Sequence, residues 1–185
     1  MDPELPKREE MRAVPASPYG NHKLQNETDM KYWSEKGVTR FVALRYFNVF
    51  GERQDPSSDY SGVISIFTSR CSSRLPLIIF GDGEQSRDFI YVRDIVRANI
   101  LSARGSDQSS FSVYNAGTGK SITLKRMTEE LFRAYGYPVP VKYQDPRVGD
   151  IRHSLSDISR ISRELDYSTQ YSFQEGLRNL ISSLE

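Results

Sequence analysis

The stretch TRFVALRYFNVFG (residues 39–51) is rich in β-branched and aromatic residues and ends at a glycine. This composition predicts a β-strand that closes at that glycine. A helix is expected before it, because Ser17 is a suitable N-cap, Pro18 suits the first helical position and Gly37 can end the helix. A second helix is expected after it, over residues 62–74. A strand flanked by helices in this way is the arrangement of an α/β protein.

The rest of the chain continues the alternation of strands and helices. Strands are expected over 75–83, 87–92, 111–117 and 139–145, and helices over 93–105, 123–136, 156–167 and 172–184. The opening segment holds three prolines and little apolar periodicity, so residues 1–16 are expected to form an arm or loop. The fold class predicted from this order is α/β, without internal repeats.

Composition excludes several classes of function. The 185 residues carry 25 basic and 24 acidic side chains, a net charge of +1 that predicts no nucleic-acid partner and no binding to anionic membranes. Cys71 is the single cysteine, and His22 and His153 are the only histidines, so a metal site is not expected. No apolar run reaches membrane-spanning length, and the charged amino terminus does not resemble a signal peptide. We therefore expect a cytoplasmic protein.

A Tyr-x-x-x-Lys spacing occurs twice, as Tyr19 with Lys23 and as Tyr32 with Lys36. Residues four apart on a helix share one face, and an ammonium close to a phenol favours the ionised phenol that proton transfer would use. The two pairs lie on different faces of the expected helix, so both cannot serve one site. Spacing alone leaves two interpretations of each pair open, a catalytic pair or a solvated helix face.

A glycine-rich turn that could cradle a dinucleotide pyrophosphate is not found in this sequence. Such a turn follows the first strand of a doubly wound sheet, where backbone amides and a helix N-terminus approach the phosphates. Two glycine-containing stretches, GDGEQS (81–86) and GTGKS (117–121), lack that context and the spacing of a phosphate-binding P-loop, so both are interpreted as plain turns.

Five ordered motifs carry a resemblance to a known family. These are SPYGNHK, LRYFNVFGERQDP, FGDGEQSRDFIYVRDIV, YNAG and PRVGDIRHSLSDISR. In this order they resemble the carboxy-terminal half of the extended short-chain dehydrogenase/reductases, in the NAD-dependent nucleotide-sugar epimerase/dehydratase family. Within it they most resemble bacterial UDP-N-acetylglucosamine 4-epimerases.

The resemblance implies a division of the chain. Residues 17–60 would be the remnant of a Rossmann-type NAD-binding domain that carries the Tyr-x-x-x-Lys helix. Residues 61–185 would form a small α/β nucleotide-sugar-binding region, from which 93–116 would return to the Rossmann sheet. The expected fold is thus the last strands and helices of a parallel sheet plus a substrate-binding domain.

The resemblance also assigns the catalytic and cofactor-binding residues. Tyr19 and Lys23 match the catalytic pair of the family, in which the tyrosinate takes the proton of the sugar O4 and the lysine bonds the nicotinamide ribose. The backbone of Tyr46 lies where the carboxamide of NAD is held. Tyr32 and Lys36 match no functional pair of the family.

Seven further residues match substrate-binding positions of the family. Asn48, Arg87 and Arg147 would bind the diphosphate, a role that suits the planar fork of a guanidinium. Asp150 would bond the uridine ribose, and Ser154 would leave room for an N-acetyl group beside C2 of the sugar. The positions that would line the uracil are Val63 and Ile78. Taken singly, each of these residues is as compatible with core packing or a solvated surface as with a role in binding.

The expected function is that of a partial UDP-sugar 4-epimerase of the UDP-GlcNAc/UDP-GalNAc type that lacks the glycine-rich cofactor half. Alone, the chain is expected to be inactive and to bind NAD weakly. Its expected partners are a UDP-sugar, a second copy of itself, or a complementing amino-terminal half. Two alternatives stay open: a non-catalytic sugar-nucleotide-binding or assembly module, and a fragment of a dehydratase or decarboxylase of the same family.

Overall fold

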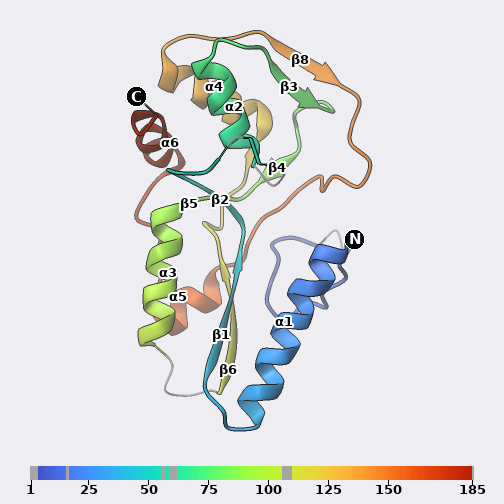
Figure 1. The fold of residues 1–185 in the computed structure, drawn as a ribbon, viewed down its shortest axis with the longest axis vertical. Helices are drawn as coiled ribbons and strands as arrows, with labels where there is room; N and C mark the ends of the chain where they lie inside the picture. The colour runs from blue at the N-terminus through green and yellow to red at the C-terminus, as the bar shows by residue number, and fades with distance from the viewer. Residues whose placement is uncertain (1–3, 16, 56, 59–61, 106–109, 185) are drawn as a thin grey trace.

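A computed structural model describes residues 4–15, 17–55, 57–58, 62–105 and 110–184 of the chain (Figure 1). The domain boundary expected at residues 60 and 61 lies outside the described residues. The helices are α1 (Pro18–Glu35), α2 (Val63–Ser72), α3 (Val92–Arg104), α4 (Leu124–Tyr135), α5 (Ser159–Leu165) and α6 (Phe173–Ser182). The strands are β1 (Phe41–Tyr46), β2 (Asn48–Phe50), β3 (Leu77–Phe80), β4 (Ser86–Arg87), β5 (Phe89–Tyr91), β6 (Phe111–Ala116), β7 (Ile122–Thr123) and β8 (Val141–Gln144). The α/β fold class is confirmed.

A parallel ladder between β1 and β6 forms the centre of one half of the molecule. It runs from the pair Phe41 and Phe111 to the pair Tyr46 and Ala116. Figure 1 shows α1 on one side of this ladder and α3 with α5 on the other. The apolar core lies on the side of α3 and α5, where Ile95, Tyr114, Ile161, Leu165 and neighbouring side chains are buried together.

Helix α1 covers the other side of the ladder with little apolar contact. Ser34 is its only residue described as buried, and its hydroxyl donates to the carbonyl of Ser110. Glu27 of α1 receives two hydrogen bonds from the Arg45 guanidinium of β1, at 2.9 and 2.8 Å. Polar contacts therefore hold α1 in place. Most of its surface is exposed.

The stretch 39–51 forms two strands where the sequence predicted one. The Phe47 amide still donates to the carbonyl of Ala116, the last residue of β6, at 3.1 Å. The Asn48 amide instead donates to the carbonyl of Asp88, the residue before β5, at 3.0 Å. The backbone thus changes hydrogen-bond partner within one residue, and β2 continues in parallel with β5. This change carries the chain from one half of the molecule into the other.

The second half of the molecule is built on β3, which pairs in parallel with β8, and on the antiparallel pair β4 and β7. Helices α2, α4 and α6 surround a core in which Phe67, Leu77, Met127, Leu131 and Leu177 are among the buried side chains. The strand expected over 87–92 is divided into β4 and β5 in the structure, and β7 was not predicted, because two residues are too few to show an alternating pattern.

The helix ends follow local signals in the sequence. Ser17 caps α1 through a 3.2 Å hydrogen bond from the Gly20 amide, and Pro18 is the first helical residue, as predicted. Ser172 and Glu175 form a capping box at the start of α6. Helix α5 begins at Ser159, three residues later than the start of its expected range, 156–167. The backbone before it has other partners, because the Asp157 amide donates to the Lys7 carbonyl at 2.9 Å and the Ser156 amide donates to Asp88 Oδ2 at 3.2 Å.

The arm before α1 has no helix in its described part, residues 4–15, and is attached to the fold by its backbone. The Lys7 amide donates to the carbonyl of Leu155 at 2.8 Å, and the Lys7 carbonyl accepts from Asn115 Nδ2 at 2.8 Å. The Glu9 carboxylate accepts from the Asn115 amide at 2.8 Å. The arm therefore lies against the end of β6.

Candidate functional site

A cavity of about 400 Å³, called here the Arg87 cavity, lies in the half of the molecule built on β3. Its lining combines three guanidinium groups with apolar side chains. The lining residues are Asn48, Val63, Ile66, Phe67, Arg70, Ile78, Phe80, Gln85, Arg87, Leu124, Arg147 and Asp150. Six of the seven residues that the sequence matched to substrate-binding positions therefore line one cavity, although they are distributed from residue 48 to residue 150.

Five separate segments bring these six residues together. Asn48 opens β2, Val63 opens α2, Ile78 lies in β3 and Arg87 closes β4. Arg147 and Asp150 follow β8, in a turn where the Asp150 amide donates to the Arg147 carbonyl at 3.2 Å. The site thus depends on tertiary packing and not on any one local motif.

The sequence prediction missed several lining residues that share elements with predicted ones. Val63, Ile66, Phe67 and Arg70 have the spacing i, i+3, i+4 and i+7, which places them on one face of α2. This periodicity was available as a signal once Val63 was assigned to the site. Phe80, which closes β3 two residues after Ile78, was missed in the same way, because alternate residues of a strand share a face.

Two of the three arginines that line the cavity, Arg87 and Arg147, are held by different contacts. Arg87 Nη2 donates to Asp150 Oδ1 at 2.7 Å, and the Arg87 side chain is only 14% exposed. The Arg147 guanidinium lies over the ring of Phe80, 3.9 Å from its centroid. Positive charge is therefore concentrated beside an apolar wall, an arrangement that suits a ligand with an anionic group and a planar apolar one.

Ser154 is the matched substrate residue that does not line this cavity. Its amide donates to the carbonyl of Ser86 at 3.0 Å, which places it directly beside β4. Ser86 is the residue before Arg87 in β4, so Ser154 is bonded to the strand that carries Arg87.

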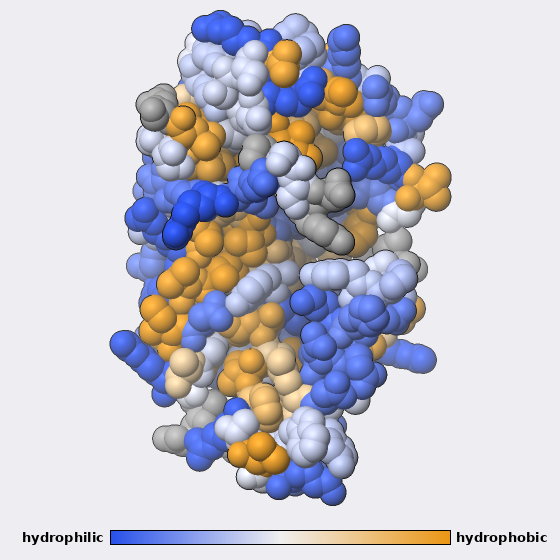
Figure 2. Space-filling view, in the orientation of Figure 1, coloured by the Kyte–Doolittle hydropathy of each residue, from blue (hydrophilic) through white to orange (hydrophobic). Residues whose placement is uncertain are grey.

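A second cavity, called the strand-edge cavity, has a volume of about 820 Å³ and lies between α1, β1 and α3. Tyr19, Lys23 and Tyr46, the three residues matched to catalytic and cofactor roles, all line it. The remaining lining residues are Asn26, Glu27, Met30, Arg40, Val42, Ala43, Leu44, Arg45, Asn99, Ser102, Ala103, Arg104 and Gly105. Figure 2 shows hydrophobic atoms gathered over α3 and β1 on this face of the molecule.

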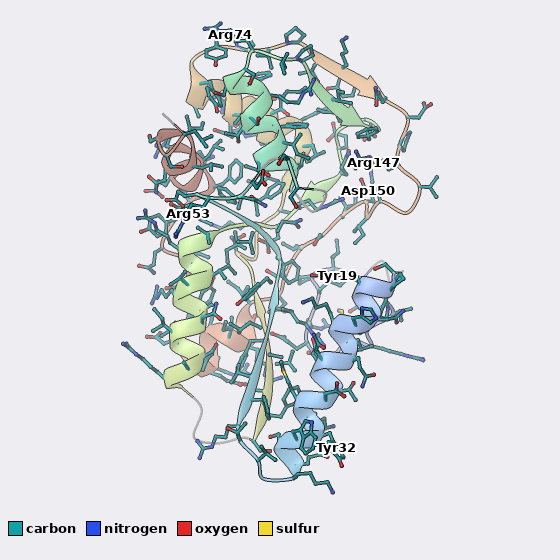
Figure 3. All side chains as sticks on the ribbon, viewed as in Figure 1. Tyr19, Tyr32, Arg53, Arg74, Arg147 and Asp150 are labelled. Atoms are coloured by element: carbon teal, nitrogen blue, oxygen red, sulfur yellow. The ribbon has the colours of Figure 1, made fainter. Side chains whose placement is uncertain are left out.

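Local geometry does not separate the two tyrosine–lysine pairs. Lys23 Nζ lies 5.3 Å from the centroid of the Tyr19 ring, and Lys36 Nζ lies 5.5 Å from that of Tyr32. The surroundings do separate them, because Tyr32 is not among the residues that line the strand-edge cavity. In Figure 3, Tyr19 lies at the end of α1 toward Arg147 and Asp150, whereas Tyr32 lies at the far end.

The two cavities are connected along the backbone by residues 46–48. Tyr46 closes β1 and lines the strand-edge cavity, and its hydroxyl donates to Asn99 Oδ1 at 2.9 Å. Asn48 opens β2 and lines the Arg87 cavity. The change of strand partner at Phe47 therefore places neighbouring residues of one segment in both cavities.

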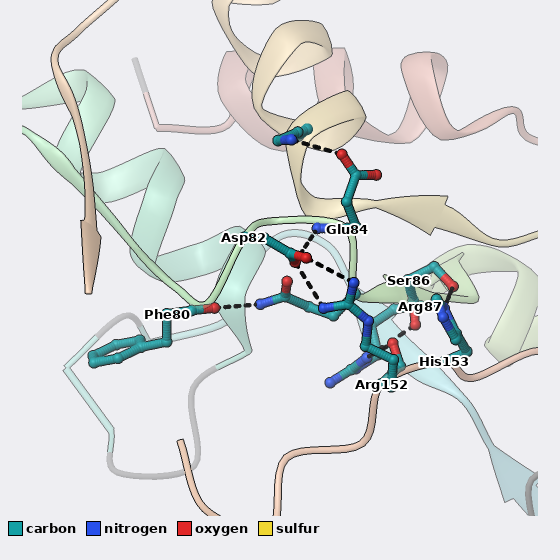
Figure 4. Close-up of polar contacts among 9 residues, drawn as sticks. Phe80, Asp82, Glu84, Ser86, Arg87, Arg152 and His153 are labelled. Carbon is teal, nitrogen blue, oxygen red and sulfur yellow. Dashed lines mark hydrogen bonds and ion pairs between the residues drawn. The ribbon is translucent and has the colours of Figure 1, made fainter. Parts of the chain in front are cut away.

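A third cavity, the Arg152 cavity, has a volume of about 520 Å³ and shares Phe80, Gln85, Arg147 and Asp150 with the Arg87 cavity. At its edge, Arg152 makes two hydrogen bonds to the Asp82 carboxylate, at 2.7 and 2.8 Å (Figure 4). These bonds, followed by one from the Glu84 amide, hold the pKa of Asp82 far below its ordinary value. The turn that begins at Gly81 is thereby attached to the segment that carries Asp150.

A buried carboxylate, Asp88, lies between β4 and β5 and holds two distant segments of the chain together. Its Oδ1 accepts from the Thr118 amide at 2.9 Å and from the Thr118 hydroxyl at 2.6 Å. Its Oδ2 accepts from the amides of Gly119 and Ser156, at 3.1 and 3.2 Å, and from the Ser156 hydroxyl. The stretch 117–121, interpreted from sequence as a plain turn, therefore has a specific acceptor. Asp88 links that turn to the segment after Ser154.

Two structural findings bear on the functions excluded from composition. Across the part of the chain that the structure describes, no cluster of His, Cys, Asp or Glu could hold a metal ion. Within the same residues, no helix has both the length and the apolar character needed to cross a membrane.

Comparisons with known proteins identify relatives of this chain. A "Putative UDP-glucose 4-epimerase" of Methanocaldococcus jannaschii is 33% identical over 96% of this chain and 56% of its own length. The solved structure of a UDP-N-acetylglucosamine 4-epimerase from Methanobrevibacter ruminantium, in complex with UDP-N-acetylmuramic acid, is 42% identical with a TM-score of 0.93. The match covers 99% of this chain and 58% of that one.

A third relative was solved with a cofactor. The UDP-glucuronic acid 4-epimerase of Bacillus cereus, in complex with UDP-glucuronic acid and NAD, is 27% identical with a TM-score of 0.86, over 96% of this chain and 55% of that one. The present chain thus spans somewhat more than half the length of these relatives and shares their Rossmann-like α/β fold. Residues 1–117 match the description "NAD dependent epimerase/dehydratase family". The chain therefore belongs to the NAD-dependent epimerase/dehydratase family.

Proposed function

We propose that this chain is the UDP-sugar-binding part of an NAD-dependent UDP-sugar 4-epimerase, of the UDP-GlcNAc/UDP-GalNAc type. One observation carries the proposal: six residues matched to nucleotide-sugar positions from sequence line a single cavity. In this function Arg87 and Arg147 bind the diphosphate, while Val63 and Ile78 contact the uracil. Asp150, now paired with Arg87, bonds the ribose and releases the guanidinium to the phosphates when the ligand enters.

The acid–base step is assigned to Tyr19 and Lys23. The phenolate of Tyr19 takes the proton of the sugar O4, and the nearby Lys23 ammonium stabilises that negative charge. The residues that line the strand-edge cavity fit the nicotinamide end of NAD, since Lys23 offers a donor to its ribose and Tyr46 lies beside them. When bound, NAD would accept a hydride from C4 of the sugar and return it to the other face.

The preference for an N-acetylated sugar is proposed from Ser154. A serine at this position, bonded to β4 through its backbone, is small enough to leave space for an N-acetyl group at C2, which a larger side chain would exclude. The similar structure from Methanobrevibacter ruminantium, whose ligand UDP-N-acetylmuramic acid carries an N-acetyl group, supports this preference.

The full reaction is proposed to require a second polypeptide segment beside β1. Among the described residues, β1 has one strand neighbour, β6. Its other edge faces the strand-edge cavity, and residues 42–46 all line that cavity. An open edge between two helices favours the addition of another strand. We infer that a complementing amino-terminal half, or a second copy of the chain, occupies this edge, and that the chain alone is inactive.

Calorimetric titration with UDP tests the proposal. The wild-type chain is expected to bind UDP, and Arg147→Ala is expected to weaken binding by about 1.5–3 kcal/mol, the magnitude of a lost charge-assisted hydrogen bond. Arg53→Ala is the matched control, because Arg53 is an exposed arginine on the opposite side of the view in Figure 3. Equal affinity of the wild type and Arg147→Ala for UDP would reject the assignment.

A further inference from the structure

Residues 145–151, called here the strap, follow β8 and return the chain toward β4. Before the strap, the Gln144 carbonyl accepts from the Gly81 amide at 2.8 Å, and after it the Arg152 carbonyl accepts from the Ser86 amide at 3.0 Å. In Figure 1 this part of the chain runs along one side of the molecule before it turns inward. The strap is therefore a short span whose two ends are fixed by backbone hydrogen bonds.

The strap itself has few contacts with the rest of the fold. All of its residues are exposed, and Val148 is exposed completely, so its side chain packs against none of the described residues. Among the described residues, the one backbone hydrogen bond of the strap is internal, from the Asp150 amide to the Arg147 carbonyl at 3.2 Å. Arg147 and Asp150 line both the Arg87 cavity and the Arg152 cavity. The strap thus borders two cavities without a backbone bond that fixes its middle.

Two side-chain contacts of the strap use groups that the proposed ligand would engage. The Arg147 guanidinium lies 3.9 Å from the centroid of the Phe80 ring, and Asp150 Oδ1 accepts from Arg87 Nη2 at 2.7 Å. The Asp150 side chain is 40% exposed, so water screens this ion pair and the pair holds the strap weakly. A diphosphate on Arg87 would also compete with Asp150 for the guanidinium. These contacts alone would therefore not keep the strap in place while a ligand enters or leaves.

A third contact lies outside the Arg87 cavity. Arg152, the residue after the strap, makes two hydrogen bonds to the Asp82 carboxylate in the turn after β3, at 2.7 and 2.8 Å (Figure 4). Two such bonds fix the orientation of both side chains. Neither Asp82 nor Arg152 lines the Arg87 cavity, so a ligand bound there leaves this pair intact. The pair can therefore hold the end of the strap in the free and the bound chain alike.

We propose that the strap is a lid on the Arg87 cavity and that the Asp82–Arg152 pair is the latch of this lid. The inference rests on the proposed function, because the ligand that the lid admits is a nucleoside diphosphate. With the pair formed, Arg147 and Asp150 stay beside the cavity; with the pair broken, the strap moves outward and the ligand passes. Because the pair forms with and without ligand, its loss speeds entry and exit by the same factor and leaves the dissociation constant unchanged. A residue that touched the ligand would instead change the dissociation constant.

The test measures the exchange of UDP in matched variants. Phosphorus NMR line shapes of UDP give its exit rate, calorimetry gives the dissociation constant, and the two together give the entry rate. In Asp82→Ala both rates are expected to rise about threefold to fivefold, the effect of one exposed ion pair, with the dissociation constant within about twofold of the wild type. Glu84→Ala is the matched control, because Glu84 lies in the same turn and pairs with Lys125 at 2.6 Å instead of with Arg152. Its rates should equal those of the wild type.

A double-variant cycle tests whether the two residues act as one latch. Both side chains are more than half exposed, so the variants are expected to fold. Arg152→Ala should give the rates of Asp82→Ala, and the double variant should add no further increase, because either change breaks the same pair. Unchanged rates in Asp82→Ala, or increases that multiply in the double variant, overturn the inference.

The affinities separate a latch from a ligand contact. A loss of affinity in Asp82→Ala that equals the rise in its exit rate indicates a direct contact with UDP and also overturns the inference. If the wild type binds UDP and the rates do not respond to Asp82→Ala, only the latch is rejected. Absence of UDP binding by the wild type rejects the proposed function and the latch together.

Discussion

Replacement of Asp88 by alanine is expected to be among the most destabilising single changes in this chain. The side chain is fully buried, and five donors from Thr118, Gly119 and Ser156 converge on its two oxygens. Without the carboxylate, three of these donors keep another partner or can turn to one. The Gly119 amide retains Ser156 Oγ at 3.2 Å, the Thr118 hydroxyl retains the Lys120 carbonyl at 3.1 Å, and the Ser156 hydroxyl can rotate.

Two backbone amides, those of Thr118 and Ser156, would be left buried without an acceptor. Each orphaned donor costs about 1–3 kcal/mol, so Asp88→Ala should lower the free energy of unfolding by about 2–6 kcal/mol. Asp88→Asn keeps one oxygen, which can remain with the two amides that meet Oδ2, and so orphans only the Thr118 amide. Its expected cost is about half that of the alanine variant.

Urea unfolding followed by circular dichroism measures both effects. With a slope of about 2 kcal/mol per molar urea, a loss of about 4 kcal/mol moves the midpoint down by about 2 M. Asp82→Ala is the control, because Asp82 is an exposed carboxylate whose ion pair with Arg152 is screened by solvent, and its midpoint should stay close to that of the wild type. A midpoint for Asp88→Ala within about 0.5 M of the wild type would show that this network contributes little.

Three further outcomes follow from the site and the core. The thiol of Cys71 is fully buried and burial raises its pKa to about 11, so at about pH 8 it should react with a disulfide reagent only after denaturant is added; rapid labelling of the native chain would contradict this. Asp150→Asn removes the counter-charge of Arg87, so calorimetry should show several-fold tighter binding of pyrophosphate, and weaker binding would argue against the ion pair as a competitor of the ligand. In a chain complemented with the amino-terminal half of a related epimerase, Tyr19→Phe should abolish epimerisation and Tyr32→Phe should retain it; the reverse result would exchange the roles of the two tyrosines.

Much of the local structure of this chain was predictable from sequence, because its signals act over a few residues. Ser17 and Pro18 set the start of α1, and the aromatic and β-branched stretch after it forms strand as expected. Such features depend on backbone dihedral preferences and on hydrogen bonds between near neighbours, which a single segment contains in full. The family resemblance extended this to candidate residues, but it could not place them relative to one another.

The arrangement of the candidate site was decided by tertiary packing. Nothing within residues 39–51 indicates that the backbone exchanges β6 for β5 at Phe47, because that exchange depends on acceptors at Ala116 and Asp88. Gln85 likewise carries no signal in its own motif, since its burial and its bond to Phe80 arise from the turn between them and from the segments packed around it.

The two tyrosine–lysine pairs show the same division in its simplest form. Their spacing determines that each lysine lies near its tyrosine, and the distances from Nζ to the ring centroid are 5.3 Å in the first pair and 5.5 Å in the second. The packing of α1 against β1 gives the first pair the strand-edge cavity to face, and the second pair does not line that cavity. Helical periodicity specifies which residues share a face, but what that face meets is determined by elements distant in the sequence, through burial and hydrogen bonds that no local pattern encodes.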